Sequence, residues 1–150
     1  MSHTEQSFQI PWQSIHHIAL NTADLDATIR FYRDVLGMQA SDNIAPSQEG
    51  RGRHCLILVK PNDDNVWGFH FFERPIARTT LGASDTHPQS FVPHVALRLP
   101  NGNAAQALRE RLSHAHVSIT EIPELGTFVF FDNNGLCLEV TWPKGEHVSL

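Results

Sequence analysis

Two short segments of the sequence share one pattern, and this repeat constrains the fold more than any other feature. His17 begins the run His-Ile-Ala-Leu, and His94, 77 positions later in a chain of 150 residues, begins the run His-Val-Ala-Leu. A repeat at that spacing is typical of two copies of one supersecondary unit, because a single copy cannot close a core alone. We therefore expect two packed modules that bring two equivalent histidines toward one place.

Composition narrows the class of protein. A single domain of this length with 41% hydrophobic and 18% charged residues is typical of a soluble globular protein. The formal net charge is −5 with no basic run, so we expect no nucleic-acid partner. No apolar run approaches the roughly 18 residues of a membrane span, so we expect no membrane partner. The first 14 residues lack signal-peptide features and the two cysteines form no disulfide framework, which together predict a cytoplasmic protein.

Both halves of the chain have the same order of predicted elements. Apolar residues at positions 25, 29, 32 and 36 predict a helix over about 24–36, and a helix over about 103–115 takes the same place in the second half. Strands are predicted around these helices, at residues 15–21, 38–45, 54–60, 66–73, 91–99, 117–122, 127–131 and 136–142. The topology is β-α-β-β-β twice in one α+β domain over 1–150, with module one at about 15–73, a linker at 74–90 and module two at about 91–142.

Four of the predicted strands carry a residue that can bind a metal ion. Side chains alternate between the two faces of a strand, and in each case this residue shares a small or polar face while the other face is apolar. The four sets are His17 with Ala19 and Asn21, His70 with Gly68 and Phe72, His94 with Ala96 and Arg98, and Glu139 with Cys137 and Thr141.

This set of side chains suits a divalent cation. Two neutral imidazoles and a carboxylate are ligands for iron, manganese, nickel, cobalt or zinc, and the sequence does not choose among them. A lone strand histidine is more often a hydrogen-bonded structural residue, so no single member carries the prediction. Glu139 adds weight because it lies between Leu138 and Val140 in a strand, where an unpaired buried carboxylate would cost several kcal/mol. A bound metal ion would offset that cost.

The same segments resemble a known group of proteins. The resemblance covers about residues 15–142, and it is to the vicinal oxygen chelate superfamily, which includes glyoxalases, fosfomycin-resistance proteins, methylmalonyl-CoA epimerases and extradiol dioxygenases. It implies two βαβββ modules that form a cupped mixed sheet with helices on the outside, a divalent metal ion, and a homodimer whose metal site is shared between chains. The segments are the two histidine runs, Phe31-Tyr32-Arg33-Asp34-Val35-Leu36-Gly37 and Phe131-Asp132-Asn133-Asn134-Gly135-Leu136-Cys137-Leu138-Glu139.

The resemblance also implies roles for individual residues. His17 is similar to the ligand on the first strand, His94 to the ligand on the fifth, and Glu139 to the carboxylate on the last. His70 occupies the place where glyoxalase-like members often carry Glu or Gln, so it is either a fourth metal ligand or an acid/base. Glu73 is nearby in the sequence but falls on the opposite face of the strand, and we place His70 ahead of it.

The resemblance leaves the activity open. A glyoxalase-like lyase or isomerase needs a base beside the metal, which His70 or a displaced Glu139 could supply. An extradiol-type dioxygenase needs iron held by two histidines and a carboxylate, which follows if His70 stays off the metal. A fosfomycin-type thiol transferase uses the same trio, but no cation-binding loop accompanies it here. The remaining alternative is a non-catalytic protein that binds a drug or metabolite.

Four further residues are candidates for contact with a small-molecule substrate whose adjacent oxygens chelate the metal. Asn21 and Arg98 could hold an anionic group, and Phe72 could form an apolar wall. Cys137 shares the face of Glu139 and could line the site, although a small buried thiol is the simpler account.

Overall fold

The computed structural model describes residues 10–41, 52–62, 68–74 and 93–144. The first half contains β1 (His17–Thr22), α1 (Leu25–Arg30), η1 (Phe31–Val35), β2 (Gln39–Ala40), β3 (His54–Leu58) and β4 (Gly68–Glu73). The second half contains β5 (His94–Arg98), α2 (Gly102–His114), β6 (Thr120–Ile122), β7 (Thr127–Phe131) and β8 (Cys137–Thr141). The predicted order of elements is confirmed in both halves, and the predicted linker lies outside the described residues apart from Arg74.

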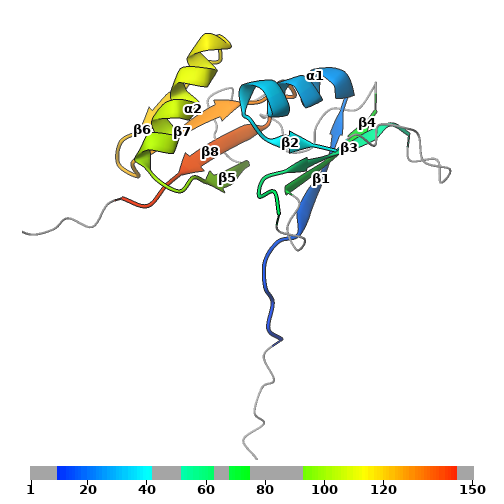
Figure 1. Ribbon diagram of the computed structural model, residues 1–150, viewed down its shortest axis with the longest axis horizontal. Coiled ribbons are helices and arrows are strands. Elements are labelled where there is room, and N and C mark those ends of the chain that lie inside the picture. Colours follow the sequence, from blue (N-terminus) through cyan, green and yellow to red (C-terminus); the bar gives the residue numbers. More distant parts are fainter. Residues whose placement is uncertain (1–9, 42–51, 63–67, 75–92, 145–150) are drawn as a thin grey trace, which may run out of the picture.

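The strands form two mixed sheets with the same topology. Sheet one has the order β1-β4-β3-β2, and sheet two has the order β5-β8-β7-β6. In each sheet the first strand of the module pairs in parallel with the last, and the other pairs are antiparallel. Both helices lie on the same side of the two sheets (Figure 1). The duplicated histidine run therefore marks a duplicated α+β unit, as we expected.

A capping residue begins the first helix. Asp24 precedes α1 in an extended conformation, and its carboxylate accepts a hydrogen bond from the backbone N–H of Ala27 at 2.8 Å. The helix continues as the π-helical turn η1, and Gly37, with φ of +75°, ends it. The face that the sequence period indicated is buried, with Leu25 and Tyr32 both fully covered.

The second helix begins and ends in a similar way. Asn101 accepts a hydrogen bond from the backbone N–H of Ala104 at 2.9 Å. At the other end His116 adopts a left-handed conformation, and the N–H of Val117 bonds to the carbonyl of Leu112. This closing turn is why β6 begins at Thr120 and not at the predicted residue 117. None of the helices in the described ranges is long and apolar enough to cross a membrane.

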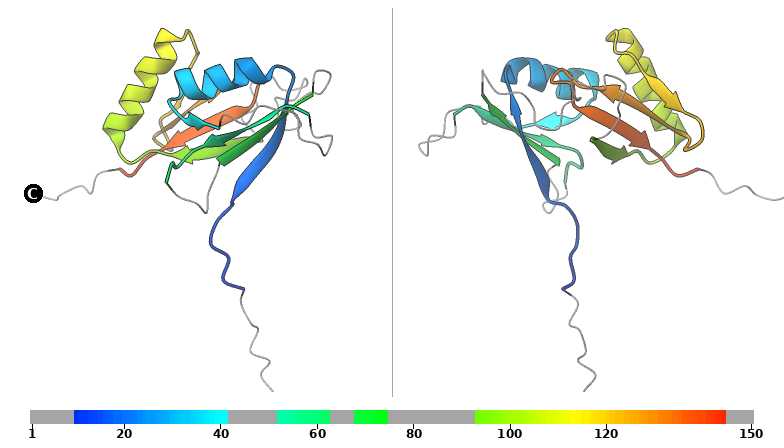
Figure 2. Two further views of the ribbon diagram at one scale, coloured as in Figure 1. Left: turned by 45° about the vertical axis from the view of Figure 1, so that its right-hand side comes forward. Right: turned by 180° about the vertical axis from the view of Figure 1, so that it is seen from behind.

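One hydrophobic core lies on the helix side of both sheets. Figure 2 shows from two further directions that the helices cover this side of the strands. Aromatic rings from the two modules meet in the core, with Phe31 of η1 and Phe130 of β7 separated by 6.4 Å between centroids. The largest fully buried side chains come from both modules, and they include Tyr32, Phe69, Phe71, Phe128, Phe130, Leu25, Ile57, Leu112, Leu136 and Leu138.

Polar contacts at the turn between β7 and β8 also join the modules. The phenol of Tyr32 donates to Asp132 at 2.9 Å, and the hydroxyl of Thr22 donates to the side-chain oxygen of Asn134 at 2.8 Å. The turn is closed by the N–H of Asp132, which donates to the carbonyl of Leu136 at 2.9 Å. The predicted hairpin turn over residues 132–135 is therefore also part of the contact between modules.

Candidate functional site

Each sheet has one face that the helices leave open. On β1 His17 and Ala19 are exposed, whereas Leu20 is buried on the helix side. On β5 His94, Ala96 and Arg98 are exposed, whereas Val95 and Leu97 are partly buried. The faces on which the sequence placed the metal-capable residues are therefore the open faces of sheets one and two.

His17 and His70 lie next to each other on the open face of sheet one. β1 and β4 pair with Ala19 opposite His70, and the centroids of the two imidazole rings are 5.9 Å apart. Phe72 follows on the same face, with its ring centroid 4.1 Å from that of His70, and Asn21 lies opposite Phe72 in the strand pairing. This face therefore gathers two expected metal donors and two expected substrate contacts.

The ring of His17 has a neighbour that influences where its proton lies. Nδ1 of His16 is 2.8 Å from Nδ1 of His17, so one of the two rings must carry its hydrogen on that atom. When His17 is the donor, its Nε2 carries the lone pair that a metal ion needs. Strand alternation had placed His16 on the other face, but β1 begins only at His17, so His16 is not held to that alternation.

His94 and Glu139 form a second pair, on the open face of sheet two. Nε2 of His94 lies 2.9 Å from a carboxylate oxygen of Glu139. The side chain of Glu139 is only 12% exposed, so this contact offsets part of the cost of removing a carboxylate from water. His94 of the same chain therefore supplies a polar contact for the carboxylate of Glu139.

Cys137 precedes this pair on the same face of β8 and lies opposite His94 in the strand pairing. Burial raises the pKa of the Cys137 thiol above its ordinary value, and the negative charge of Glu139 raises that pKa further. The thiol therefore stays protonated near neutral pH, where it is a weak nucleophile. Its surroundings are those of a small buried side chain beside the carboxylate.

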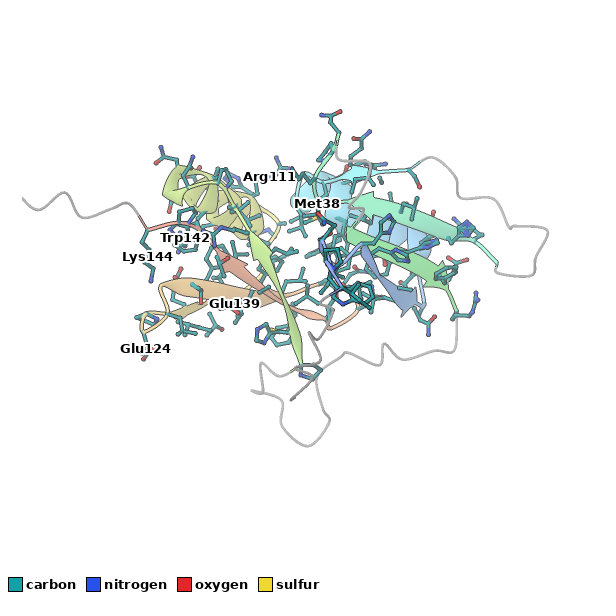
Figure 3. The ribbon with its side chains drawn as sticks, turned by 90° about the horizontal axis from the view of Figure 1, so that it is seen from below. Met38, Arg111, Glu124, Glu139, Trp142 and Lys144 are labelled. Atoms are coloured by element: carbon teal, nitrogen blue, oxygen red, sulfur yellow. The ribbon has the colours of Figure 1, made fainter. Side chains whose placement is uncertain are left out.

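The expected donors come as two pairs and not as one cluster. His17 and His70 belong to sheet one, whereas His94 and Glu139 belong to sheet two. In Figure 3 Glu139 lies among the strands of sheet two, apart from the blue strand β1. Within the described ranges, no group of three or more His, Cys, Asp or Glu side chains is close enough to hold one metal ion. One chain alone therefore presents two partial sites.

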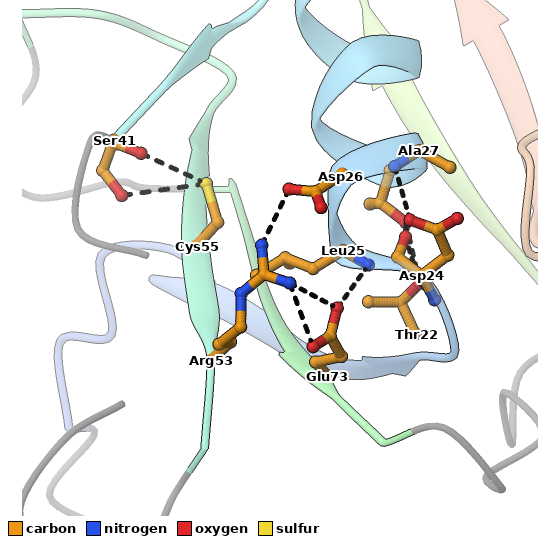
Figure 4. A network of polar contacts seen from close by, with 10 residues as sticks. Thr22, Asp24, Leu25, Asp26, Ala27, Ser41, Arg53, Cys55 and Glu73 are labelled. Atoms are coloured by element: carbon orange, nitrogen blue, oxygen red, sulfur yellow. Dashed lines mark hydrogen bonds and ion pairs between the residues drawn. The ribbon is translucent and has the colours of Figure 1, made fainter. Parts of the chain in front are cut away.

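The carboxylate of Glu73 makes its contacts on the helix side of sheet one. It accepts a hydrogen bond from the backbone N–H of Leu25 at 3.0 Å, at the start of α1 (Figure 4). Arg53 approaches the same carboxylate at 3.3 Å and also donates to Asp26 at 2.7 Å. Glu73 thus supports the first turn of the helix, whereas His70 lies on the open face beside His17.

His54 is a residue of the open face that sequence reasoning missed. Its ring centroid lies 5.1 Å from that of His70 and 5.5 Å from that of Phe72. Its Nδ1 is buried and makes no hydrogen bond to the described part of the chain. The register that sets His54 opposite Phe72 would have revealed it, but the amino-acid sequence between β3 and β4 contains no two-residue hairpin signal from which that register could be predicted.

Comparisons with known proteins agree with the duplicated fold. The model of the Glyoxalase/Bleomycin resistance protein/Dioxygenase superfamily matches residues 14–140. No curated protein matches the sequence. The match to the superfamily model covers most of both modules.

Solved structures show the same architecture. A glyoxalase/dioxygenase from Nostoc punctiforme matches with a TM-score of 0.64 at 20% identity, over 92% of this chain and 98% of the other. The fosfomycin resistance protein FosX from Mesorhizobium loti matches with a TM-score of 0.62 at 12% identity, over 91% and 95%. An antibiotic-binding protein from a Streptomyces species matches with a TM-score of 0.59 at 15% identity, over 91% and 100%. The chain therefore belongs to the Glyoxalase/Bleomycin resistance protein/Dioxygenase superfamily, which confirms the predicted membership of the vicinal oxygen chelate superfamily.

Proposed function

We propose that the protein is a metal-dependent, glyoxalase-like lyase or isomerase that acts on a small oxygen-bearing substrate. The observation that carries this proposal is the division of the metal-capable residues into two pairs on open faces. A homodimer that sets sheet one of one chain against sheet two of its partner would bring His17 together with a partner copy of the pair His94 and Glu139. Each dimer would then hold two equivalent sites.

The residues fit a divalent ion. Two imidazoles and a carboxylate match iron, manganese, nickel, cobalt or zinc. His94 and Glu139 are already within 2.9 Å of each other, so they need little rearrangement to share a ligand. The contact between Nδ1 of His16 and Nδ1 of His17 orients the His17 ring, as metal-bound histidines are commonly oriented through the ring nitrogen that does not bind the metal. A divalent ion would also neutralise the carboxylate of Glu139, which is largely withdrawn from water.

The chain supplies the remaining parts of the chemistry. The bound ion would provide Lewis acidity toward the oxygens of a chelating substrate. His70, beside His17, would act as a fourth ligand or would move the substrate proton, and Glu139 is the alternative base. Phe72 would pack against an apolar part of the substrate. Asn21, Cys137 and Arg98 are the further candidate contacts, with Arg98 as the cation for an anionic group.

An extradiol-type dioxygenase is the second candidate, and the surroundings of His70 favour it. Nε2 of His70 is buried, and the ring packs on Phe72 and against His54. If this packing keeps His70 off the metal, the remaining ligands are two histidines and one carboxylate, the set that non-haem iron oxygenases use. The number of protein ligands therefore separates the two activities.

Metal analysis of protein purified without chelator tests the proposal. We expect His94→Ala and Glu139→Ala each to weaken metal binding about tenfold or more, measured by equilibrium dialysis with elemental analysis. His114→Ala is the matched control, because His114 lies in the last turn of α2, away from both open faces, and should bind metal like the wild type. Unchanged metal content in both site variants would remove the basis of the enzyme proposal and favour a non-catalytic binder.

Activity assays then decide between the two reactions. Nickel or zinc with isomerisation of methylglyoxal–thiol adducts would support the glyoxalase-like activity. Iron with oxygen uptake on catechols would support the dioxygenase, since that reaction needs a redox-active metal.

A further inference from the structure

A cavity of about 330 Å³ lies where the two modules meet. It is lined on one side by the turn after η1, with Leu36 and Met38, and on the other by the strand β5 and the helix α2. Phe130 and Val140 also line it, and both point to the helix side of sheet two. Since Glu139 faces the other side of β8, sheet two separates this cavity from the open face that carries the proposed metal ligands.

The walls of the cavity are mostly apolar and incompletely covered. Leu97, Leu99 and Leu108 line it and are each only partly buried, as is Met38 on the opposite wall. Apolar surface of this kind is stabilised when a ligand removes it from water, by about 25 cal/mol per Å². The volume lies at the lower end of the roughly 300–1,000 Å³ that small-molecule pockets occupy.

Of the described residues that line the cavity, two are charged, Arg98 and Arg111, and both are cations. The side chain of Arg98 shares the open face of β5 with His94, so Arg111 is the cation on the cavity's side of sheet two. The guanidinium of Arg111 donates from Nε to the carbonyl of Val35 at 2.7 Å and from Nη2 to the carbonyl of Asp34 at 2.8 Å. These carbonyls hold the group in place at the end of η1 without a net charge to neutralise it. The carboxylate of Asp34 is paired with Arg33 at 2.7 Å and does not line the cavity. The hydrogen bond from Arg33 is the main cause that lowers the pKa of Asp34, and the charge of Arg111 contributes to lowering it, so this carboxylate lies near Arg111 outside the cavity.

The turn at Gly37 packs directly against this guanidinium. A Cβ at Gly37 would lie 3.4 Å from the central carbon of the Arg111 guanidinium, which is the limit of ordinary van der Waals contact. Figure 3 shows Arg111 and Met38 on facing elements where the modules meet. The cation is therefore fixed beside an apolar wall, which is the arrangement that recognises an amphipathic anion.

We propose that this cavity binds a small molecule with a compact apolar body and one anionic group, such as an aromatic or aliphatic carboxylate. The apolar body would lie against Phe130 and Leu108, and the anion would contact the free edge of the Arg111 guanidinium. This inference does not depend on the proposed metal site, because the two lie on opposite faces of sheet two.

A pair of fluorescent probes that differ by one charge tests the proposal. Anilinonaphthalene sulfonate is anionic, and phenylnaphthylamine is the matching neutral molecule. We expect the full-length protein to bind the anionic probe about tenfold more tightly, because only this probe gains a charge-assisted contact. Equal affinity for the two probes would overturn the charge assignment.

Substitutions on α2 locate the binding site. Ala107→Trp places a large side chain in the cavity and should weaken binding of both probes about tenfold or more. Gln106→Trp is the matched control, since Gln106 is the adjacent exposed residue and does not line the cavity. Wild-type affinity in Ala107→Trp would overturn the proposal. Binding that weakens as the protein associates with itself would also overturn it, because a second copy would then be the occupant.

Arg111→Met removes the positive charge and keeps an unbranched side chain, so it tests the contribution of the charge. It should weaken binding of the anionic probe about tenfold while leaving the neutral probe unchanged. Because Arg111 also ties α2 to the end of η1, the melting temperature of this variant is measured first, and if the variant unfolds the comparison of Ala107→Trp with Gln106→Trp decides. Glu139→Ala should bind both probes with wild-type affinity. Weaker binding of the probes by this variant would show that they bind at the open face, which would overturn the proposal.

Discussion

At the scale of single residues, Asp132 shows how one buried side chain holds the two modules together. It is 6% exposed, and its carboxylate accepts hydrogen bonds from the backbone N–H groups of Asn134 and Leu136 and from the phenol of Tyr32. Burial raises the pKa of the Asp132 carboxyl above its ordinary value, and these hydrogen bonds only partly oppose that effect. Burial and the negative charge of Asp132 raise the pKa of Tyr32 as well, so the phenol remains a donor.

The raised pKa of Asp132 makes a pH-dependent contribution to stability. Between the ordinary value of 3.8 and the higher folded value, the folded state keeps a proton that the unfolded state has lost. The contribution of this group is therefore fully present below the ordinary pKa and is lost as the pH rises through the folded pKa. We expect the unfolding free energy of the wild type, relative to that of Asp132→Asn, to fall over this window and then level off.

Urea unfolding at a series of pH values measures this difference. Tyr32→Phe supplies a second test, because it removes a hydrogen bond that lowers the pKa of Asp132, so the same fall should extend to higher pH. A difference between wild type and Asp132→Asn that does not change with pH would contradict the account.

The faces of single residues could be predicted from the sequence, but their partners could not. Alternation along a strand fixes the side to which His17, His94 and Glu139 point. That Glu139 contacts His94, however, depends on which strands pair and in which register. His54 shows the limit clearly, because it reaches His70 only through the pairing of β3 with β4.

At the scale of elements, the start of α1 depends on carboxylates from two places in the chain. Asp24 caps the helix locally, whereas Glu73 reaches it from the end of β4 and contacts the N–H of Leu25. The free N–H groups of a first helical turn need such acceptors. The element that covers sheet one is therefore attached to that sheet at its first residue.

Asp24→Ala should lower the unfolding free energy by about 1 kcal/mol, the usual effect of removing an N-cap side chain. Chemical denaturation measures the loss. Asp26→Ala is the control, because Asp26 follows in the same turn and its ion pair with Arg53 is exposed, so its effect should be clearly smaller. Equal losses in the two variants would show that the cap does not stabilise the helix.

The sequence predicted the elements better than their ends. The apolar period over positions 25–36 indicated one helix, and the structure confirms a continuous run that widens into a π-helical turn at Phe31. β6 is shorter than expected because the left-handed turn at His116 uses residues that had the composition of a strand. The hydrophobic pattern of a sequence predicts which residues are buried. The end of a helix or strand depends instead on where the backbone hydrogen bonds change partners.

At the scale of the whole molecule, the proposed dimer makes a sharp prediction about mixed chains. His17→Ala and Glu139→Ala would each inactivate every site of their own homodimer. In a mixed dimer one site would carry both changes and the other neither. Unfolding and refolding the two variants together in equal amounts should therefore restore metal binding at about a quarter of all sites.

Elemental analysis after dialysis measures this recovery. His94→Ala refolded with Glu139→Ala is the control. Both changes lie in sheet two, so every site formed by any combination of these chains lacks one proposed ligand, and mixing should restore no metal binding. Metal bound by either variant alone at wild-type level, or no recovery on mixing variants from different sheets, would contradict a site shared between chains.

The duplication and the superfamily could be predicted from the sequence, because the repeat of His-Ile-Ala-Leu as His-Val-Ala-Leu states that there are two modules. How the modules meet could not, since the contacts of Tyr32 and Thr22 with the turn over residues 132–135 join residues from different modules and lie outside the repeated run. A repeated sequence segment predicts the fold of each module. The contacts between the modules are made by residues that the repeated segment does not include.

The open faces of the two sheets have a consequence for how such a protein changes over time. Side chains there contribute little to the shared core, so exchanging them alters what the surface recognises while the scaffold keeps its folding energy. Proteins with this fold are therefore able to acquire new reactivity through single substitutions on the open faces, without compensating substitutions in the core.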